Sequence, residues 1–427
     1  MKQEGAARQF AGSAPEKRDD MLERMRQYAR LLIRVGVNIQ KGQNLVLLCP
    51  VECAQFGRMC ATEAYAAGCR EVIVSWRDDY MTREKYLKAA DDVFDAYPAW
   101  LAAFYNDNAS EGAAFLAISA SDPENLKGVD PGRLQRAEVS SGAAVQTYRR
   151  LQMSNGFPWC IASVPVDSWA QKVFPGADKQ AAVERLWDAI CAAVRVDGGD
   201  PVKNWEEHLA SLGARKKKLN EYRFRSLHYT NSLGTDLTIE LPKTHFWQAG
   251  GDRTHGGQVF IANMPTEEIF TAPKRDGVNG VAVASMPLVK DGNVIDGFRM
   301  RFENGKIVEV QAEQGEDVLR SAIAVDEGAS YLGEVALVPY DSPISNAGVL
   351  FYNTLFDENA SCHLAFGEAY PCIDGGMEMD KRELAEHGLN DSITHVDFMI
   401  GTPDLSIVGT TWDGEQIPVF TNGNFAF

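Results

Sequence analysis

The order of apolar and polar residues in the first third of the chain predicts helices that alternate with buried strands. Residues 20–35 and 53–67 carry apolar side chains at helical spacing, and a glycine follows each segment. Short, almost continuous apolar runs lie between and after these segments, at residues 45–49, 71–76 and 114–119. Such runs are typical of strands covered on both faces, so we expect an α/β fold with a mostly parallel sheet covered by helices.

The pattern changes after two further helix-like segments, at residues 178–195 and 201–218. Beyond Phe224, short alternating runs predominate, and Asn304-Gly305 between two of them is a strong hairpin signal. The second half is therefore expected to be an α+β domain rich in antiparallel strands. We place a loose N-terminal tail at residues 1–17, an N-terminal α/β domain at 18–215, and a C-terminal α+β domain, expected to be catalytic, at 216–427.

The net charge of the chain limits the classes of partner that it is expected to bind. Among 427 residues, 42 are basic and 59 acidic, so the formal net charge is −17. Such a charge repels nucleic acid and anionic membranes. No apolar segment is long enough to span a membrane, and the N-terminus has no signal-peptide pattern. The eight cysteines form no C-x-x-C pair, which favours reduced, buried thiols, so we expect a cytoplasmic protein.

The segment around His395 is the most informative for chemistry. Alternation along the predicted strand places His395 and Asp397 on one face. An imidazole beside a carboxylate suits a divalent metal ion. On this segment alone, a histidine that its neighbour orients at a sheet edge is the favoured interpretation.

A second segment carries Cys362 and His363 after a polar turn. Adjacent strand residues point to opposite faces, so these two are not expected to form a nucleophile–base pair of a thiol protease. Taken alone, His363 is also compatible with a histidine buried in the core.

Two further segments place carboxylates among apolar residues. Glu267 and Glu268 stand together at the start of a predicted strand, and Glu334 lies inside an apolar run. A carboxylate buried there must be paired, protonated or bound to a metal ion. Together with the two histidines and Asp397, these carboxylates suffice for a two-metal site.

Several long motifs resemble those of the thermophilic-type metallo-aminopeptidases, the family of aminopeptidases T and S. The resemblance covers nearly the whole chain and is densest after residue 263. The motifs that carry it are Asn263-Met-Pro-Thr-Glu-Glu-Ile-Phe-Thr-Ala-Pro273, Leu332-Gly-Glu-Val-Ala-Leu-Val338, Tyr352-Asn-Thr-Leu-Phe-Asp-Glu-Asn-Ala-Ser-Cys-His363 and His395-Val-Asp-Phe-Met-Ile-Gly401.

The resemblance implies a set of site residues. By motif, the metal ligands fall on two glutamates, two histidines, an aspartate and a tyrosine: Glu268, Glu334, His363, His395, Asp397 and Tyr370. His363 and Tyr370 lie seven residues apart, so a regular strand would place them on opposite faces. We therefore expect a bend or bulge near Gly367.

The resemblance also implies the activity. We expect an aminopeptidase that hydrolyses the N-terminal peptide bond of small peptides with a free amine, through a water or hydroxide activated by two divalent ions, zinc, cobalt or similar. Glu334 is the expected bridging ligand, Glu267 a candidate general base, and Tyr370 a candidate to steady the oxyanion. The family is typically homodimeric, so a homodimer is expected.

Two alternatives differ in class from this expectation. One is a two-metal hydrolase of another substrate class, such as phosphoesters. Phosphate sites favour basic side chains, whereas these motifs are flanked mainly by acidic and apolar residues, Lys274 and Arg275 excepted. The other is a non-catalytic peptide-binding protein whose metal ligands are structural.

Overall fold

The structure is a computed structural model that describes residues 15–290 and 293–427. By internal contacts, the described chain forms two compact units. The N-terminal unit runs to Glu207 and also includes Gly251–Pro265, and the C-terminal unit comprises His208–Gly250 and Thr266–Phe427. The change of unit falls inside one continuous helix, α9 (Pro201–Tyr222).

The domain bounds expected from the sequence stay predictions. The expected boundary after residue 215 lies within the same helix, α9. Of the expected loose tail over residues 1–17, the part before Pro15 lies outside the described residues. Helix α1 begins at Pro15.

The N-terminal unit is built on a five-stranded sheet with the order β10-β4-β3-β1-β2, in which every neighbouring pair is parallel. Its strands are β1 (Leu45–Pro50), β2 (Val72–Arg77), β3 (Ala114–Ile118), β4 (Trp159–Ala162) and β10 (Asn263–Met264). The apolar residues of β1 and β3 are almost completely buried, as expected for strands covered on both faces. The three strands predicted at the N-terminus are thus confirmed within one or two residues at each end.

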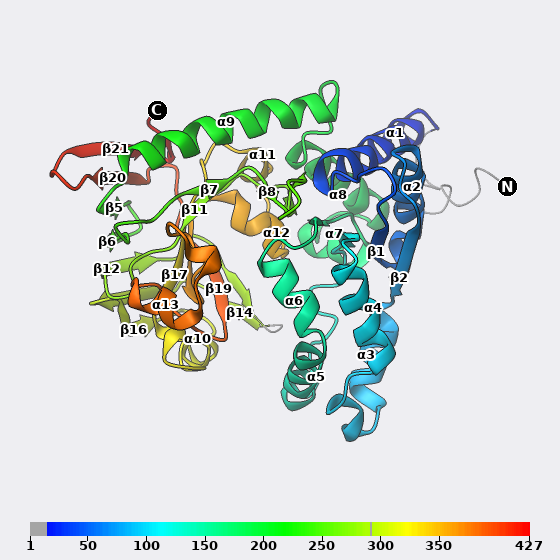
Figure 1. The fold of residues 1–427 in the computed structure, drawn as a ribbon, viewed down its shortest axis with the longest axis horizontal. Coiled ribbons are helices and arrows are strands. Elements are labelled where there is room, and N and C mark those ends of the chain that lie inside the picture. Colours follow the sequence, from blue (N-terminus) through cyan, green and yellow to red (C-terminus); the bar gives the residue numbers. More distant parts are fainter. Residues whose placement is uncertain (1–14, 291–292) are drawn as a thin grey trace. The chain divides into compact units, whose positions relative to one another are not determined.

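Helices flank this sheet (Figure 1). They are α1 (Pro15–Leu31), which continues as a π-helical turn (Leu32–Gly36), α2 (Ala54–Ala66), α3 (Asp79–Lys88), α4 (Ala99–Ser110), α5 (Pro131–Ala144), α6 (Gln146–Met153), α7 (Asp167–Val173) and α8 (Lys179–Ala193). Strand β10 was not predicted, because two residues carry no recognisable alternation. It brings a later segment of the chain back beside β4.

The C-terminal unit contains two larger antiparallel sheets. The first has the strand order β16-β15-β12-β6-β5-β20-β21-β22. Its strands are β5 (Ser226–Thr230), β6 (Asp236–Glu240), β12 (Val278–Val283), β15 (Arg299–Glu303), β16 (Lys306–Gln311), β20 (Ser406–Thr410), β21 (Gln416–Thr421) and β22 (Asn424–Phe425). The predicted hairpin at Asn304-Gly305 is confirmed between β15 and β16.

The second sheet of this unit has the order β19-β18-β17-β11-β7 and holds the candidate site. Its strands are β7 (Gln248–Ala249), β11 (Ile269–Thr271), β17 (Leu332–Leu337), β18 (His363–Gly367) and β19 (His395–Met399). All residues of β17 and β18 are buried. Short helices lie between its strands: α10 (Glu316–Ala322), α11 (Pro343–Asn346), α12 (Thr354–Asp357) and α13 (Lys381–Glu386). The α/β fold class with a mainly antiparallel second half is confirmed.

A search of the described residues for membrane spans finds no helix that is both long enough and apolar enough. All eight cysteines are buried and free.

Candidate metal centre

Three neighbouring strands bring four of the predicted ligands to one place, and Glu268 directly precedes the next strand of the sheet, β11. In the antiparallel register, Ala365 of the central strand β18 stands opposite both Glu334 of β17 and Asp397 of β19. Gly367 stands opposite His395. His363, Ala365 and Gly367 share one face of β18 because strand residues alternate. The small residues at 365 and 367 leave room over this face for the longer side chains on either side.

Four distances define the cluster. The Nε2 atom of His363 lies 3.4 Å from Oε2 of Glu268 and 3.7 Å from Oε1 of Glu334. The Nε2 atom of His395 lies 3.3 Å from Oε2 of Glu334 and 3.3 Å from Oδ1 of Asp397. The residues therefore form two groups of three potential ligands, and both groups contain Glu334. Each oxygen of the Glu334 carboxylate faces a different histidine.

Backbone carbonyls orient both imidazoles. The Nδ1 atom of His395 lies 2.8 Å from the carbonyl oxygen of Glu368, and Nδ1 of His363 lies 3.3 Å from that of Ser361. A carbonyl only accepts, so Nδ1 carries the proton in each ring. In the metal-free cluster Nε2 is protonated as well and donates to the carboxylates. Loss of that second proton leaves the Nε2 lone pair for a metal ion, the usual arrangement for metal-binding histidines.

The charges of the cluster are strongly coupled. Burial opposes ionisation of His395, but its contacts with Asp397 and Glu334 raise its pKa to about 11. Burial would likewise raise the pKa of Glu334, yet the two imidazoles lower it to about 2. His363 keeps a pKa well above its usual range through Glu268 and Glu334, despite burial. Among the described residues, the ion pairs of these carboxylates are those with the two imidazoles.

This donor set fits divalent metal ions. Carboxylate oxygens and imidazole nitrogens are the ligands that zinc and similar ions take in catalytic sites. No thiol takes part, because Cys362 points away and donates its S–H to the carbonyl of Val338, and burial raises its pKa to about 12. The thiol-protease interpretation therefore has no geometric support.

Comparison with known proteins identifies the family. The model of the thermophilic metalloprotease family (M29) matches residues 21–425. The chain belongs to that family. Aminopeptidase AmpS of Bacillus subtilis (strain 168) is 46% identical to it over 410 residues, which cover 96% of this chain and 100% of that protein. Aminopeptidase 2 of Geobacillus stearothermophilus is 44% identical over 402 residues, covering 94% and 97%.

A solved structure of an aminopeptidase is similar in fold to this chain over almost its full length. Wild-type AmpT from Thermus thermophilus shares 39% identity and a TM-score of 0.90 with this chain, and the match covers 95% of this chain and 100% of that one. The resemblance seen in the motifs is thereby confirmed, and so is the expected enzyme class, a metallo-aminopeptidase.

The remaining residues predicted for the metalloprotease site lie at different places around it. The ring centroid of Tyr370 lies 5.3 Å from that of His395, and burial, with the nearby carboxylates, raises the pKa of its phenol well above the usual value. Glu267 belongs to neither ligand group. Its carboxylate lies 3.8 Å from Nε2 of His208, and its backbone N–H donates to Asn359.

The expected irregularity between His363 and Tyr370 is present. Strand β18 ends at Gly367, whose φ is +112°, a conformation that favours glycine. The register between β17 and β18 also shifts between Leu332 and Glu334, so Gly333 forms a bulge on the facing strand. These two features allow Tyr370 to approach His395.

Sequence reasoning missed one acidic residue, Glu358. Burial raises the pKa of its carboxyl well above the usual value, and the charges of Asp397, Glu268 and Glu334 add to the shift. Glu358 thus lies beside the ligand cluster. It sits in a single 3-10 turn after α12, where no strand alternation marks its direction. A signal was present, since the Asp357-Glu358 pair interrupts an otherwise uncharged motif.

Proposed function

We propose that the chain is a two-metal aminopeptidase that removes the N-terminal residue from small peptides with a free amine. The arrangement of Glu334 carries the proposal, because its two oxygens face two histidines that belong to different ligand groups. One ion would be held by Glu268, Glu334 and His363, and the other by Glu334, His395 and Asp397. The expected ions remain zinc, cobalt or similar.

When bound, such ions would polarise the scissile carbonyl and lower the pKa of a water from about 15.7 towards 7. The protein's own residues would orient the reactants and handle the protons. The phenol of Tyr370 stays protonated under ordinary conditions, so it is suited to donate a hydrogen bond to the oxyanion that develops on the carbonyl. The residue as a whole is 37% exposed, so part of it is accessible to a substrate although its hydroxyl is desolvated.

Two carboxylates are candidates for the general base. Glu267 was predicted from its motif, but its carboxylate faces His208. We infer that Glu358 is better suited. Its carboxyl lies close enough to Asp397, Glu268 and Glu334 for their charges to raise its pKa. A base must lie within hydrogen-bond reach of the proton it accepts.

The acidic surroundings support a substrate with a free α-ammonium group. The centre contains four carboxyl groups, those of Glu268, Glu334, Glu358 and Asp397. Among the described residues, no lysine or arginine forms an ion pair with Glu268, Glu334 or Asp397. A phosphoester would lack a cationic partner from the protein here.

The experiment that tests this function is hydrolysis of leucine p-nitroanilide before chelation, after chelation, and after zinc or cobalt is added back. We expect activity to disappear and to return. No activity in any state, with metal occupancy established by elemental analysis, would favour the binding protein. Faster cleavage of p-nitrophenyl phosphate than of the anilide would favour the other hydrolase.

We also propose an oligomeric state and a cellular location for the protein. A homodimer, implied by the resemblance, would appear as twice the 47.0 kDa chain mass in sedimentation equilibrium. Cytoplasmic location is proposed from the eight cysteines, which are all free and buried, as in a reducing compartment, and fractionation of cells with an antibody to the chain tests it.

A further inference from the structure

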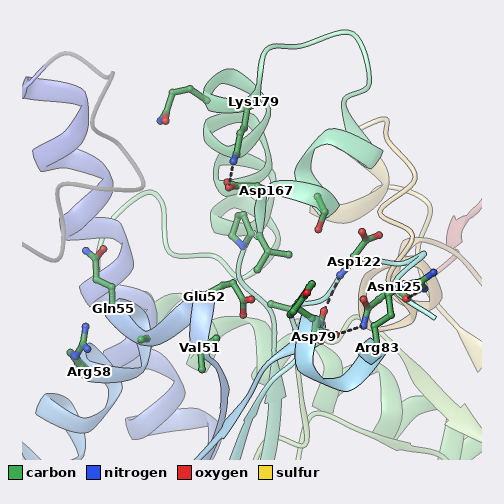
Figure 2. A pocket seen from close by; sticks show the side chains of 17 residues that line it. Val51, Glu52, Gln55, Arg58, Asp79, Arg83, Asp122, Asn125, Asp167 and Lys179 are labelled. Carbon is green, nitrogen blue, oxygen red and sulfur yellow. Dashed lines mark hydrogen bonds and ion pairs between the residues drawn. The ribbon is translucent and has the colours of Figure 1, made fainter. Parts of the chain in front are cut away.

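We propose that the N-terminal unit contains a second site, which binds a short peptide whose two termini are both charged. The site is a cavity of about 1150 Å³, and every residue that lines it belongs to this unit, whereas the metal ligands belong to the C-terminal unit (Figure 2). The inference goes beyond the proposed function, because it concerns binding away from the ligand cluster and needs no catalysis.

The cavity lies where the topology of a parallel sheet favours a ligand. After β1 the chain continues to β2 on one side, and it then crosses to β3 on the other side of β1. The connections that leave β1 and β3 therefore diverge at their carboxyl ends, which is where ligands bind in open α/β sheets. The segments that follow β1, β2, β3 and β4 all contribute to the lining, through Val51, Asp79, Ala120 and Pro165 among others.

One side of the cavity is suited to a carboxylate. Gln55 and Arg58 lie there on α2, near the beginning of that helix (Figure 2). The Nε2 atom of Gln55 is shielded from solvent and has no hydrogen-bond partner among the described residues. The Arg58 guanidinium has no ion pair within the described part of the chain. The helix start lacks a side-chain cap, so its N–H groups add to the positive potential.

The opposite side of the cavity is suited to an ammonium group. Asp79 and Asp122 lie there together, with Glu52 towards the middle (Figure 2). One oxygen of Asp79 accepts from the backbone N–H of Asp122 at 3.3 Å. Among the described residues, no lysine or arginine side chain forms an ion pair with either aspartate. Arg83, the cation on this side, donates to the carbonyl of Asn125.

The rest of the lining limits the class of ligand. Lys179 and Asp167 pair with each other at 2.6 Å, so they add no net charge. Val51, Pro165 and Val166 supply an apolar surface for side chains or methylene groups. The lining holds four carboxylates against three cations, which disfavours a ligand with negative charge only, such as a phosphate. A zwitterion of a few residues satisfies both sides and suits the volume.

Binding of tri-D-alanine to the full chain after chelation of its metal tests the proposal. Calorimetric titration with the free peptide is compared with its C-terminal amide and its N-acetyl form. We expect Arg58→Gln to weaken binding of the free peptide about tenfold, the effect of one charged hydrogen bond. In that variant, the amide should bind as well as the free peptide. Asp122→Asn should likewise weaken binding of the free peptide. In that variant, the N-acetyl form should bind as well as the free peptide.

Arg70→Gln is the matched control, because Arg70 is exposed in the same unit and lies outside the lining. It should bind tri-D-alanine like the wild type. The proposal is overturned if Arg58→Gln leaves the affinity unchanged, if the amide and Arg58→Gln weaken binding additively, or if millimolar inorganic phosphate displaces the peptide. Since the titration uses metal-free protein, its failure is separate from a failure of the anilide assay.

Discussion

The Oε2 atom of Glu334 lies 3.3 Å from the Nε2 atom of His395. Its other oxygen, Oε1, lies 3.7 Å from Nε2 of His363. One buried carboxylate thus joins two groups of potential ligands. Buried carboxylates need a compensating charge, so this arrangement supports the proposed two-ion centre.

The first prediction separates the two candidate bases. Glu358→Gln should lower kcat at least about 100-fold, as expected for loss of a general base, while the metal content stays unchanged. Glu267→Gln should also keep its metal but lose much less activity, because Glu267 faces His208. Steady-state kinetics on leucine p-nitroanilide and elemental analysis measure both. A larger loss in Glu267→Gln would assign the base to Glu267 instead.

Tyr370→Phe tests the oxyanion contact. Removing one oxyanion donor typically costs a factor of about 10² to 10³ in kcat. We expect a loss of that size with little change in KM, because the ring and its edge-on contact with His395 remain. An unchanged kcat would show that the hydroxyl plays no part in the chemical step, and loss of metal would make the phenol a ligand.

The strand end at Gly367 should tolerate no side chain. A Cβ atom there would lie 2.0 Å from the carbonyl oxygen of Thr394, at a φ of +112°. Gly367→Ala should therefore destabilise the protein by about 3 kcal/mol or more. Gly414→Ala is the control, because its φ is +93° but nothing lies within 4 Å, and it should cost about 1 kcal/mol. Equal urea midpoints for the two variants would contradict the account.

Metal binding should release protons even at pH 8. A histidine with an ordinary pKa of about 6.5 is already neutral there. In the metal-free protein the pKa of His395 is about 11, so an ion at Nε2 must displace a proton. Calorimetry with zinc in two buffers of different ionisation enthalpy measures this release. It should persist in His228→Gln, an exposed control, and decrease in His395→Gln.

The raised pKa of His395 also determines the direction in which the stability of the metal-free protein changes with pH. For the metal-free fold, the contribution of His395 is fully present below about pH 6.5, the ordinary value, and is lost as the pH rises through about 11. Chelated protein should therefore unfold at lower urea concentration at pH 10 than at pH 7, and His395→Gln should flatten this dependence. An identical pH slope in His395→Gln would remove the histidine from the coupled cluster.

Periodicity alone predicted much of the fold. Apolar runs of five or six residues marked β1, β2 and β3, and alternation placed His395 and Asp397 on one face of β19, where their side chains lie 3.3 Å apart. The apolar run around Glu334 marked a buried carboxylate. These signals are local, so a single sequence contains them.

Other features depend on contacts between distant segments. Strand β10 is two residues long, and its place beside β4 comes from pairing rather than from pattern. The bulge at Gly333 arises from the register with β18. Glu358 turns toward the cluster from an irregular segment, so only the folded chain brings it near Asp397.

The most direct test of the central claim is the metal content of the wild type and of Glu334→Ala, measured by elemental analysis after dialysis against zinc or cobalt. The wild type and the exposed control Glu111→Ala should each hold two ions per chain. Glu334→Ala should hold fewer than one and lose its activity, because both ligand groups share the missing carboxylate. Two ions retained in Glu334→Ala would contradict the bridged centre.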